Sequence, residues 1–267
     1  MKRKEAARLR QDSYTFRAMN LWLESHAKPL VIGHRGASAH APENTLAAFR
    51  LAREQGAHGV EFDVKRCATG EVVIMHDASV DRTTNGRGNV HQLSLDELRR
   101  LDAGNGERVP LLDEVFEELG GRDHPTFLFN VEVTNYQTRG DGLEAAVIEV
   151  VRRHNIANRV LFSSFNPLSV HMLSRLAPEI PRAILYAPNM PRHLREVWLG
   201  PIVAHEFRHP HFSMVTAEMV EALRNRFLRV NAWTVNEPED IARMIACGVA
   251  GIIGDSPQTI LDLGFKI

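Results

Sequence analysis

The chain has 267 residues, 44% hydrophobic and 24% charged, a length that suits one or two domains or a single α/β barrel of about 250 residues. Its 32 basic and 33 acidic residues give a formal charge of −1, which argues against a nucleic-acid partner bound by counterion release. Two cysteines, Cys67 and Cys247, provide neither a disulfide framework nor a zinc cluster. Any metal ligands are therefore His, Asp or Glu.

The first thirty residues begin with basic side chains and contain no long apolar run. No apolar stretch of ~7–15 residues follows the basic start to form a signal-peptide core, and no run of ~18 exists to span a membrane. We therefore expect a cytoplasmic protein. Phe16, Met19 and Leu23 recur at helical spacing, which predicts a short helix in an N-terminal extension, residues 1–28. The helix caps the domain or, as the alternative, makes peripheral membrane contact.

Strand-like and helix-like segments alternate from residue 30 onward. Asn44 is a candidate N-cap for a helix over 46–55, Thr216 is one for a later helix, and Asn236 with Pro238 opens a helix that Gly248 ends. Nine apolar, β-branched runs predict strands. These runs are Leu30–Gly33, Val60–Val64, Val72–Met75, Phe127–Val133, Val160–Phe162, Ala183–Tyr186, Phe212–Val215, Leu228–Trp233 and Gly251–Ile253.

Nine strands are one too many for an eight-stranded barrel. Val60–Val64 and Val72–Met75 are joined by about seven residues, too few for the crossover that parallel strands need, so they should form an antiparallel hairpin. The remaining eight predict a distorted (β/α)8 TIM barrel over residues 29–267. A doubly wound sheet is the runner-up, but no G-x-G-x-x-G follows the first strand. The long connection before Phe127 predicts a lid insertion at about 78–115, with a short helix at Leu95–Leu101.

Two of the predicted strands carry polar residues on one face. Strand alternation places Glu61 and Asp63 on one side of the first, and Asn130 and Glu132 on one side of the second, which predicts that all four point into the barrel lumen. Burying three carboxylates costs roughly several kcal/mol per ion unless they are paired. All-oxygen ligands favour Mg²⁺ or Ca²⁺ over zinc. The alternative is an internal salt bridge to Lys65 or Arg35.

Two histidines stand at predicted strand ends, where barrel active sites form. His34 ends the first strand, and His76 ends the hairpin strand and precedes Asp77. A turn centred near Thr69 and Gly70 places His76 opposite Asp63, beside the predicted metal. An imidazole titrates near neutral pH, so it can both give and accept a proton. We therefore take His34 and His76 as candidate acid/base residues.

The run VIGHRGASAHAPENTLAAFRLAREQGAHGVEFDVKRCATGEVVIMHDASVDRTTNGRG, followed in order by FNVEV, SSFN, AWTVN and GIIGDSP, resembles the glycerophosphodiester phosphodiesterase family. The match spans roughly residues 30–260. It is specific because HRG, PENT, E-x-D, HD and RTT-x-G occur together in sequence. The resemblance implies a distorted TIM barrel that hydrolyses glycerophosphodiesters, such as glycerophosphocholine, to sn-glycerol 3-phosphate and an alcohol.

The resemblance also implies site residues. Glu61, Asp63 and Glu132 match the family's ligands for one divalent cation, Mg²⁺ or Ca²⁺; His34 and His76 match its acid/base pair. Arg35 matches its phosphate-contacting arginine. Which histidine is the acid, and whether a cyclic phosphate forms, stay open.

One position departs from the family pattern. The lysine that usually follows the third acidic ligand by two residues is Thr134 here. Lys65, on the same face as Glu61 and Asp63, is a candidate replacement at the phosphate. Phe165 and Trp233 end strands and are candidate contacts for the alcohol portion of the substrate.

Alternative functions stay open at this point. A lysophospholipase D activity on acylated glycerophosphodiesters is possible if the mouth is apolar and open. A phosphodiester-binding barrel without turnover is the non-catalytic alternative. An amidohydrolase is disfavoured, because the first strand ends in His-Arg-Gly and lacks a His-x-His metal pair.

Overall fold

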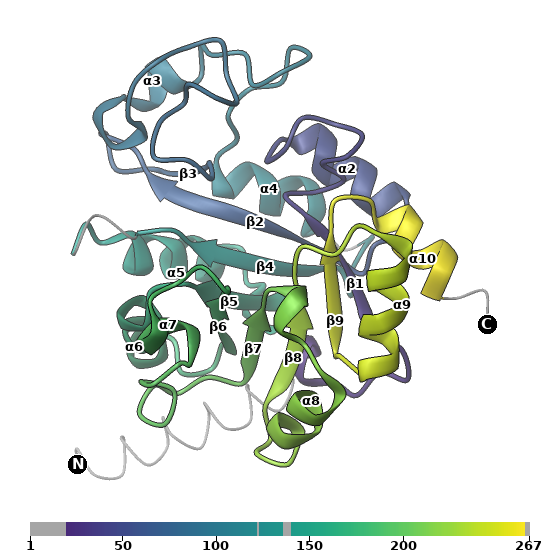
Figure 1. Ribbon diagram of the computed structural model, residues 1–267. Helices are drawn as coiled ribbons and strands as arrows, with labels where there is room; N and C mark the ends of the chain where they lie inside the picture. The colour runs from purple at the N-terminus through teal and green to yellow at the C-terminus, as the bar shows by residue number, and fades with distance from the viewer. Residues whose placement is uncertain (1–19, 122, 136–139, 265–267) are drawn as a thin grey trace.

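The computed structural model describes residues 20–121, 123–135 and 140–264. Eight parallel strands form a barrel in the order β1-β9-β8-β7-β6-β5-β4-β2, which the pairing of β1 with β2 closes; β3 adds to β2 antiparallel. Figure 1 shows helices packed around the outside of this ring. The strands are β1 (Leu30–His34), β2 (Gly59–Arg66), β3 (Val72–Ile74), β4 (Leu128–Val133), β5 (Val160–Ser164), β6 (Arg182–Tyr186), β7 (Phe207–Pro210), β8 (Arg229–Ala232) and β9 (Gly251–Gly254).

Helices occupy the connections between strands, so the predicted TIM barrel with its extra hairpin strand is confirmed. No described helix combines the length and the apolarity needed to cross a bilayer. The α-helices are α2 (Leu46–Glu54), α3 (Leu95–Leu98), α4 (Leu112–Leu119), α5 (Leu143–Arg153), α6 (Pro167–Leu176), α7 (Arg192–Arg195), α8 (Ala217–Arg224), α9 (Pro238–Cys247) and α10 (Pro257–Gly264). The 3₁₀-helices are η1 (Leu21–Leu23), η2 (Val90–Gln92), η3 (Ala157–Arg159) and η4 (Phe212–Met214).

One predicted strand was wrong. The run Phe212–Val215 is not a strand: most of it forms η4, and the barrel strand at this place is β7, Phe207–Pro210. Phe212 and Val215 of this run pack with the outer cluster of β8 and α9, and Met214 packs against a second cluster that includes Ile184 and Tyr186 of β6, which accounts for the strand-like composition of the run. The sequence of β7 is not typical of a buried barrel strand, because it contains Arg208 and His209, which are both buried.

Two predicted helix caps were also wrong. Thr45, not Asn44, caps α2 through its hydroxyl. Glu237, not Asn236, precedes α9, although the helix does begin at the predicted Pro238. The predicted roles of Thr216, whose hydroxyl accepts the Met219 N–H at 3.2 Å, and of Gly248 after α9 are confirmed. Both asparagine side chains bind carboxylates of the site instead.

The hairpin register differs by one residue from the prediction. Val64 pairs with Ile74, and the Met75 N–H donates to the Asp63 carbonyl at 3.0 Å. The turn is a three-residue loop that ends on Gly70 with φ +106°, so its centre falls on Thr69. Met75 therefore faces Asp63 across the hairpin, and His76 lies on the loop beyond β3.

Strand alternation produces two separate apolar layers. Val60, Phe62 and Val64 of β2 point outward against the helices, while the lower lumen is filled by a cluster that includes Ile32 and Phe207. Above this cluster the inner positions of β2 and β4 become polar. The barrel therefore has an apolar floor and a polar mouth.

The segment between β3 and α4 has a small core of its own. Met75, Val80, Val90, Leu98 and Val109 are buried together in it. In Figure 1 this insertion, which carries α3, stands beyond the end of β2 at the top of the view. It thus lies over the end of the barrel where β2 finishes.

The predicted N-terminal helix falls largely outside the described residues, which exclude Phe16 and Met19. Leu23 belongs to η1. In the same element Trp22 is 1% exposed, packs with the lumen cluster, and donates its indole N–H to the Arg159 carbonyl at 2.9 Å. Trp22 therefore closes the floor of the barrel.

Replacing this floor residue should destabilise the barrel. We expect Trp22→Ala to lower the free energy of unfolding by about 3–5 kcal/mol, because it deletes a large buried side chain. Trp198→Ala, at a tryptophan that is 59% exposed, is the control and should change it by about 0.5 kcal/mol or less. Denaturant unfolding of the two variants measures the difference; equal losses would show that Trp22 does not close the core.

Candidate active site

Three carboxylates meet at the mouth of the barrel. Glu61 and Asp63 come from β2 and Glu132 from the neighbouring β4, where Asp63 and Glu132 are register partners. Each offers an oxygen within 4.8 Å of those of the other two, and all three side chains are buried. The predicted inward orientation of this acidic trio is therefore present in the fold.

The acidic trio is electrostatically unfavourable by itself. Burial raises the pKa of Glu61 well above its ordinary value, and the charges of Asp63 and Glu132 add to that effect. Two groups of Arg35 oppose it: its backbone N–H donates to Glu61 Oε2 at 3.0 Å, and its Nε lies 3.4 Å from Asp63 Oδ2. One guanidinium against three carboxylates leaves excess negative charge, and the all-oxygen donor set fits a hard divalent cation.

The turn after β1 positions Arg35. Arg35 and Gly36 have φ values of +53° and +87°, and a Cβ on Gly36 would lie 2.6 Å from the backbone of Ala48. Only glycine fits there. The turn aims the Arg35 N–H at Glu61, which explains why the His-Arg-Gly sequence has this form.

His34 lies beside the acidic trio. Its Nδ1 is 2.6 Å from Asp255 Oδ1, and its Nε2 is 4.0 Å from Glu61 Oε2. Asp255 accepts further hydrogen bonds from Ser38 Oγ at 3.0 Å and Asn236 Nδ2 at 2.6 Å. Burial by itself would raise the pKa of Asp255, but the hydrogen bond from His34 and the other contacts lower it below its ordinary value. Asp255 thus holds His34 with its Nε2 toward the site.

His76 is held in the same way on the loop that follows β3. Its Nδ1 lies 2.6 Å from Asp77 Oδ1, and Asp77 accepts a hydrogen bond from Arg82 Nε at 2.7 Å. Hydrogen bonds from Arg82 and His76 lower the pKa of Asp77, against a smaller effect of burial. The His76 side chain is 39% exposed, so its imidazole remains open to the mouth.

A chain of ion pairs connects His76 to the acidic trio. Beyond Asp77, Arg82 donates to both oxygens of Glu43 at 2.8 Å, and Glu43 accepts from Arg35 Nη1 at 2.7 Å. Burial opposes ionisation of Glu43, but the two arginines lower its pKa to about 2. The insertion that carries Arg82 is therefore tied to the residue that contacts Glu61 and Asp63.

Lys65 and Thr134 lie together above the acidic trio. Lys65 Nζ donates to Thr134 Oγ1 at 2.8 Å and to the Thr134 carbonyl at 3.1 Å. Burial lowers the pKa of Lys65, while the charges of Asp63 and Glu132 act in the opposite direction. The ammonium of Lys65 thus lies next to the side chain of Thr134.

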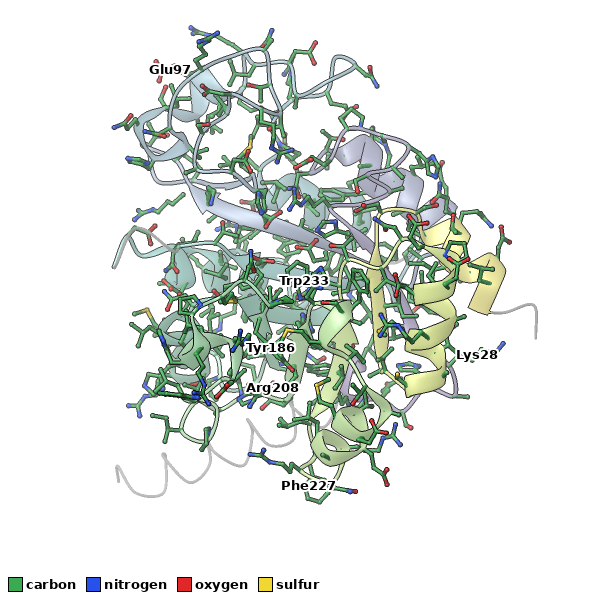
Figure 2. The ribbon with its side chains drawn as sticks, viewed as in Figure 1. Lys28, Glu97, Tyr186, Arg208, Phe227 and Trp233 are labelled. Atoms are coloured by element: carbon green, nitrogen blue, oxygen red, sulfur yellow. The ribbon has the colours of Figure 1, made fainter. Side chains whose placement is uncertain are left out.

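Phe165 and Trp233 contact each other at the mouth. Their ring centroids are 5.3 Å apart with an interplanar angle of 85°, and the Trp233 indole N–H donates to the His209 carbonyl at 2.8 Å. Trp233 lies near the middle of the barrel in Figure 2. These two predicted residues form an aromatic pair across the ends of β5 and β8.

Sequence reasoning missed several residues of this site. Asn44, with φ +58°, turns its amide toward Asp63 and donates to Oδ2 at 3.0 Å. Asp77 and Asp255 hold the two histidines, and Arg82 connects one of them to Glu43. The available signal was proximity to the motifs: Asp77 adjoins His76, and Asn44 lies within PENT.

Comparison with known proteins identifies the family. The model of the glycerophosphoryl diester phosphodiesterase family matches residues 34–259. A glycerophosphodiester phosphodiesterase of Caldanaerobacter subterraneus subsp. tengcongensis is 40% identical over 88% of this chain and 98% of its own length. One from Bacillus altitudinis is 35% identical over 85% and 95%.

A solved structure agrees with the sequence relatives. The Oleispira antarctica phosphodiesterase in complex with the product sn-glycerol-3-phosphate is 32% identical, with a TM-score of 0.78 over 88% of this chain and 96% of that chain. The fold is therefore shared over most of both chains. The chain belongs to the glycerophosphoryl diester phosphodiesterase family and is an enzyme of this hydrolase class.

Proposed function

We propose that the enzyme hydrolyses glycerophosphodiesters to sn-glycerol 3-phosphate and an alcohol, with a divalent cation bound by Glu61, Asp63 and Glu132. One observation carries the proposal: three buried carboxylates lie within 4.8 Å of one another, near two histidines that are each paired to an aspartate at 2.6 Å. His34 Nε2 is 4.0 Å from Glu61, and His76 follows Met75, whose N–H donates to the Asp63 carbonyl. The product named for the Oleispira relative supports this substrate class. Membership in an enzyme family argues against the non-catalytic barrel.

The acidic trio fits Mg²⁺ or Ca²⁺ because its ligand atoms are all oxygens. When bound, such an ion neutralises charge on the phosphoryl oxygens and on the attacking group. Arg35, fixed between Glu43 and Asp63, and Lys65, above the trio, add positive charge for the phosphate. Lys65 thereby replaces the family's lysine at the position of Thr134.

His34 and His76 form the acid/base pair. In each, an aspartate binds Nδ1, which leaves Nε2 to exchange a proton with the reacting groups. One imidazole takes the proton of the nucleophile, and the other gives a proton to the leaving alcohol. Phe165 and Trp233 line the mouth beside the substrate. A cytoplasmic location, a small-molecule substrate and the absence of a nucleic-acid partner remain predictions.

Hydrolysis should require a bound divalent cation. We expect release of sn-glycerol 3-phosphate from glycerophosphocholine to stop with a chelator and to return with Mg²⁺ or Ca²⁺. Mutation of a residue that only supports a metal ligand typically weakens metal affinity about 10–100-fold. Glu61→Gln changes a proposed ligand itself, so it should weaken metal affinity by more than that, as measured by calorimetric titration. Glu149→Gln, at a side chain that is 79% exposed, is the control. Chelator-resistant turnover would contradict the proposal.

Lysophospholipids are the competing substrates. Assays with lysophosphatidylcholine and glycerophosphocholine at equal concentration compare kcat/KM for the two. We expect glycerophosphocholine to be preferred, because Lys65, Arg35 and the two histidines make the mouth polar. Higher kcat/KM for lysophosphatidylcholine would assign the enzyme as a lysophospholipase D.

Removing an acid/base group should affect turnover and not metal binding. His76→Ala is expected to lower kcat by about 10²–10⁴-fold and to leave metal affinity near that of the wild type, because His76 is not a ligand. His171→Ala, at an exposed histidine of α6, serves as the control. If His76→Ala retains wild-type kcat, its assigned role is wrong.

The ion pairs of Glu43 should make stability depend on acid pH. The pKa of Glu43 is about 2 in the fold against an ordinary 4.5, so ionised Glu43 stabilises the fold above pH 4.5 and this contribution is lost as pH falls toward 2. Glu43→Gln should therefore unfold more easily than the wild type near neutral pH, with a gap that narrows below pH 4.5. Denaturant unfolding across this pH range checks it; a gap that stays constant would refute it.

A further inference from the structure

A cavity of about 310 Å³ opens next to His76, between the end of the barrel and the insertion. Its walls come from the ends of β2 and β4, the loop after β3, η2 and the start of α5. The volume is large enough for a small alcohol. The residues that matter here are Lys65, Arg66, His76, His91, Thr134 and Asp141.

The cavity continues outward from the acidic trio. Lys65 follows Asp63 by two positions on β2, and Thr134 follows Glu132 by two just beyond β4, so both lie on the inner face one step closer to solvent. His76 forms another wall of the same space. A phosphodiester with its phosphorus at the trio can therefore extend one ester arm into the cavity, past His76.

The cavity is lined by cations and by acids. Lys65 and Arg66 bring positive charge to it, and Asp77 and Asp141 bring negative charge. Within the described residues, the hydrogen bonds of Lys65 and Arg66 go to neutral oxygens: those of Thr134 for Lys65, and the carbonyls of Gly70 and Asp141 for Arg66. His91 adds an exposed imidazole from η2.

The acids that line the cavity are engaged elsewhere. Asp77 binds His76 and Arg82, and Asp141 Oδ1 accepts the Leu143 N–H at 2.9 Å. With both acids already bound, Lys65, Arg66 and His91 are the donors that the cavity offers to a ligand rich in oxygen acceptors.

We propose that this cavity binds the leaving alcohol and selects alcohols that carry a carboxylate or several hydroxyls over those that carry a quaternary ammonium. The inference rests on the proposed hydrolysis and adds the substrate class. A carboxylate accepts hydrogen bonds from Arg66 and His91, whereas a trimethylammonium group offers no acceptor and is repelled by Lys65 and Arg66. Arg66 and His91 are thus specificity-determining residues.

Two substrates with the same glycerol phosphate half test the proposal. With Mg²⁺ or Ca²⁺ present, we expect kcat/KM for glycerophosphoserine to exceed that for glycerophosphocholine by about tenfold, a difference of ~1.4 kcal/mol. Arg66→Gln and His91→Gln should each lower the serine-to-choline ratio, and Arg66→Gln should raise kcat/KM for the choline substrate because a repelling cation is removed. Arg87→Gln, which removes an exposed cation of the same insertion, should leave the ratio unchanged.

The outcomes separate the two hypotheses. If neither substrate is hydrolysed in the presence of metal, the proposed function itself fails. If both are hydrolysed with equal kcat/KM and the ratio is the same in Arg66→Gln and His91→Gln as in the wild type, the cavity proposal is overturned. Arg66 also connects the hairpin turn to the segment before α5, so Arg66→Gln can lower the stability of the fold. In that case the serine-to-choline ratio of His91→Gln tests the cavity proposal.

Discussion

The repulsion among three buried carboxylates governs the rest of the site. Glu61, Asp63 and Glu132 are brought within 4.8 Å by the parallel pairing of β2 and β4, and burial together with that proximity raises the pKa of Glu61. The neighbouring polar contacts all act on this cluster: the Arg35 turn donates to Glu61, and the Asn44 amide donates to Asp63. Since these groups offset only part of the negative charge, the cluster fits the divalent cation that we propose there.

The two histidines are held by different parts of the fold. His34 depends on Asp255, which follows β9, so its orientation depends on the β1–β9 pairing that helps to close the barrel. His76 depends on Asp77 and, through Arg82 and Glu43, on Arg35. A displacement of the insertion would thus alter both the position of His76 and the charge beside the acidic trio. The insertion is therefore connected to both the proposed acid/base residue and the acidic trio.

Several predictions from local pattern agreed with the structure for a clear physical reason. The alternation in β2 and β4 correctly placed the acidic residues inside, because side-chain direction in a strand has a fixed period of two. The two predicted strands were joined by about seven residues, which required an antiparallel hairpin because a parallel crossover needs a longer connection. The pattern failed at β7, where Arg208 and His209 are buried inside a barrel strand. The more apolar segment that forms η4 was predicted to be the strand instead. It failed again at Asn44, whose capping chemistry suits either a helix start or a carboxylate.

Residue order and periodicity were therefore enough to predict the barrel, the acidic trio, the two histidines and the family resemblance, since each depends on short contiguous motifs or on the local pattern of apolar residues. Tertiary structure alone decided which partners these residues have. The contact between His34 and Asp255 spans 221 positions in sequence, and the one between Lys65 and Thr134 spans 69. The charge of the cavity beside His76 likewise follows from β2, β4, η2 and α5 meeting in space. Such contacts depend on how distant segments pack, which the spacing of residues along one strand or helix does not contain.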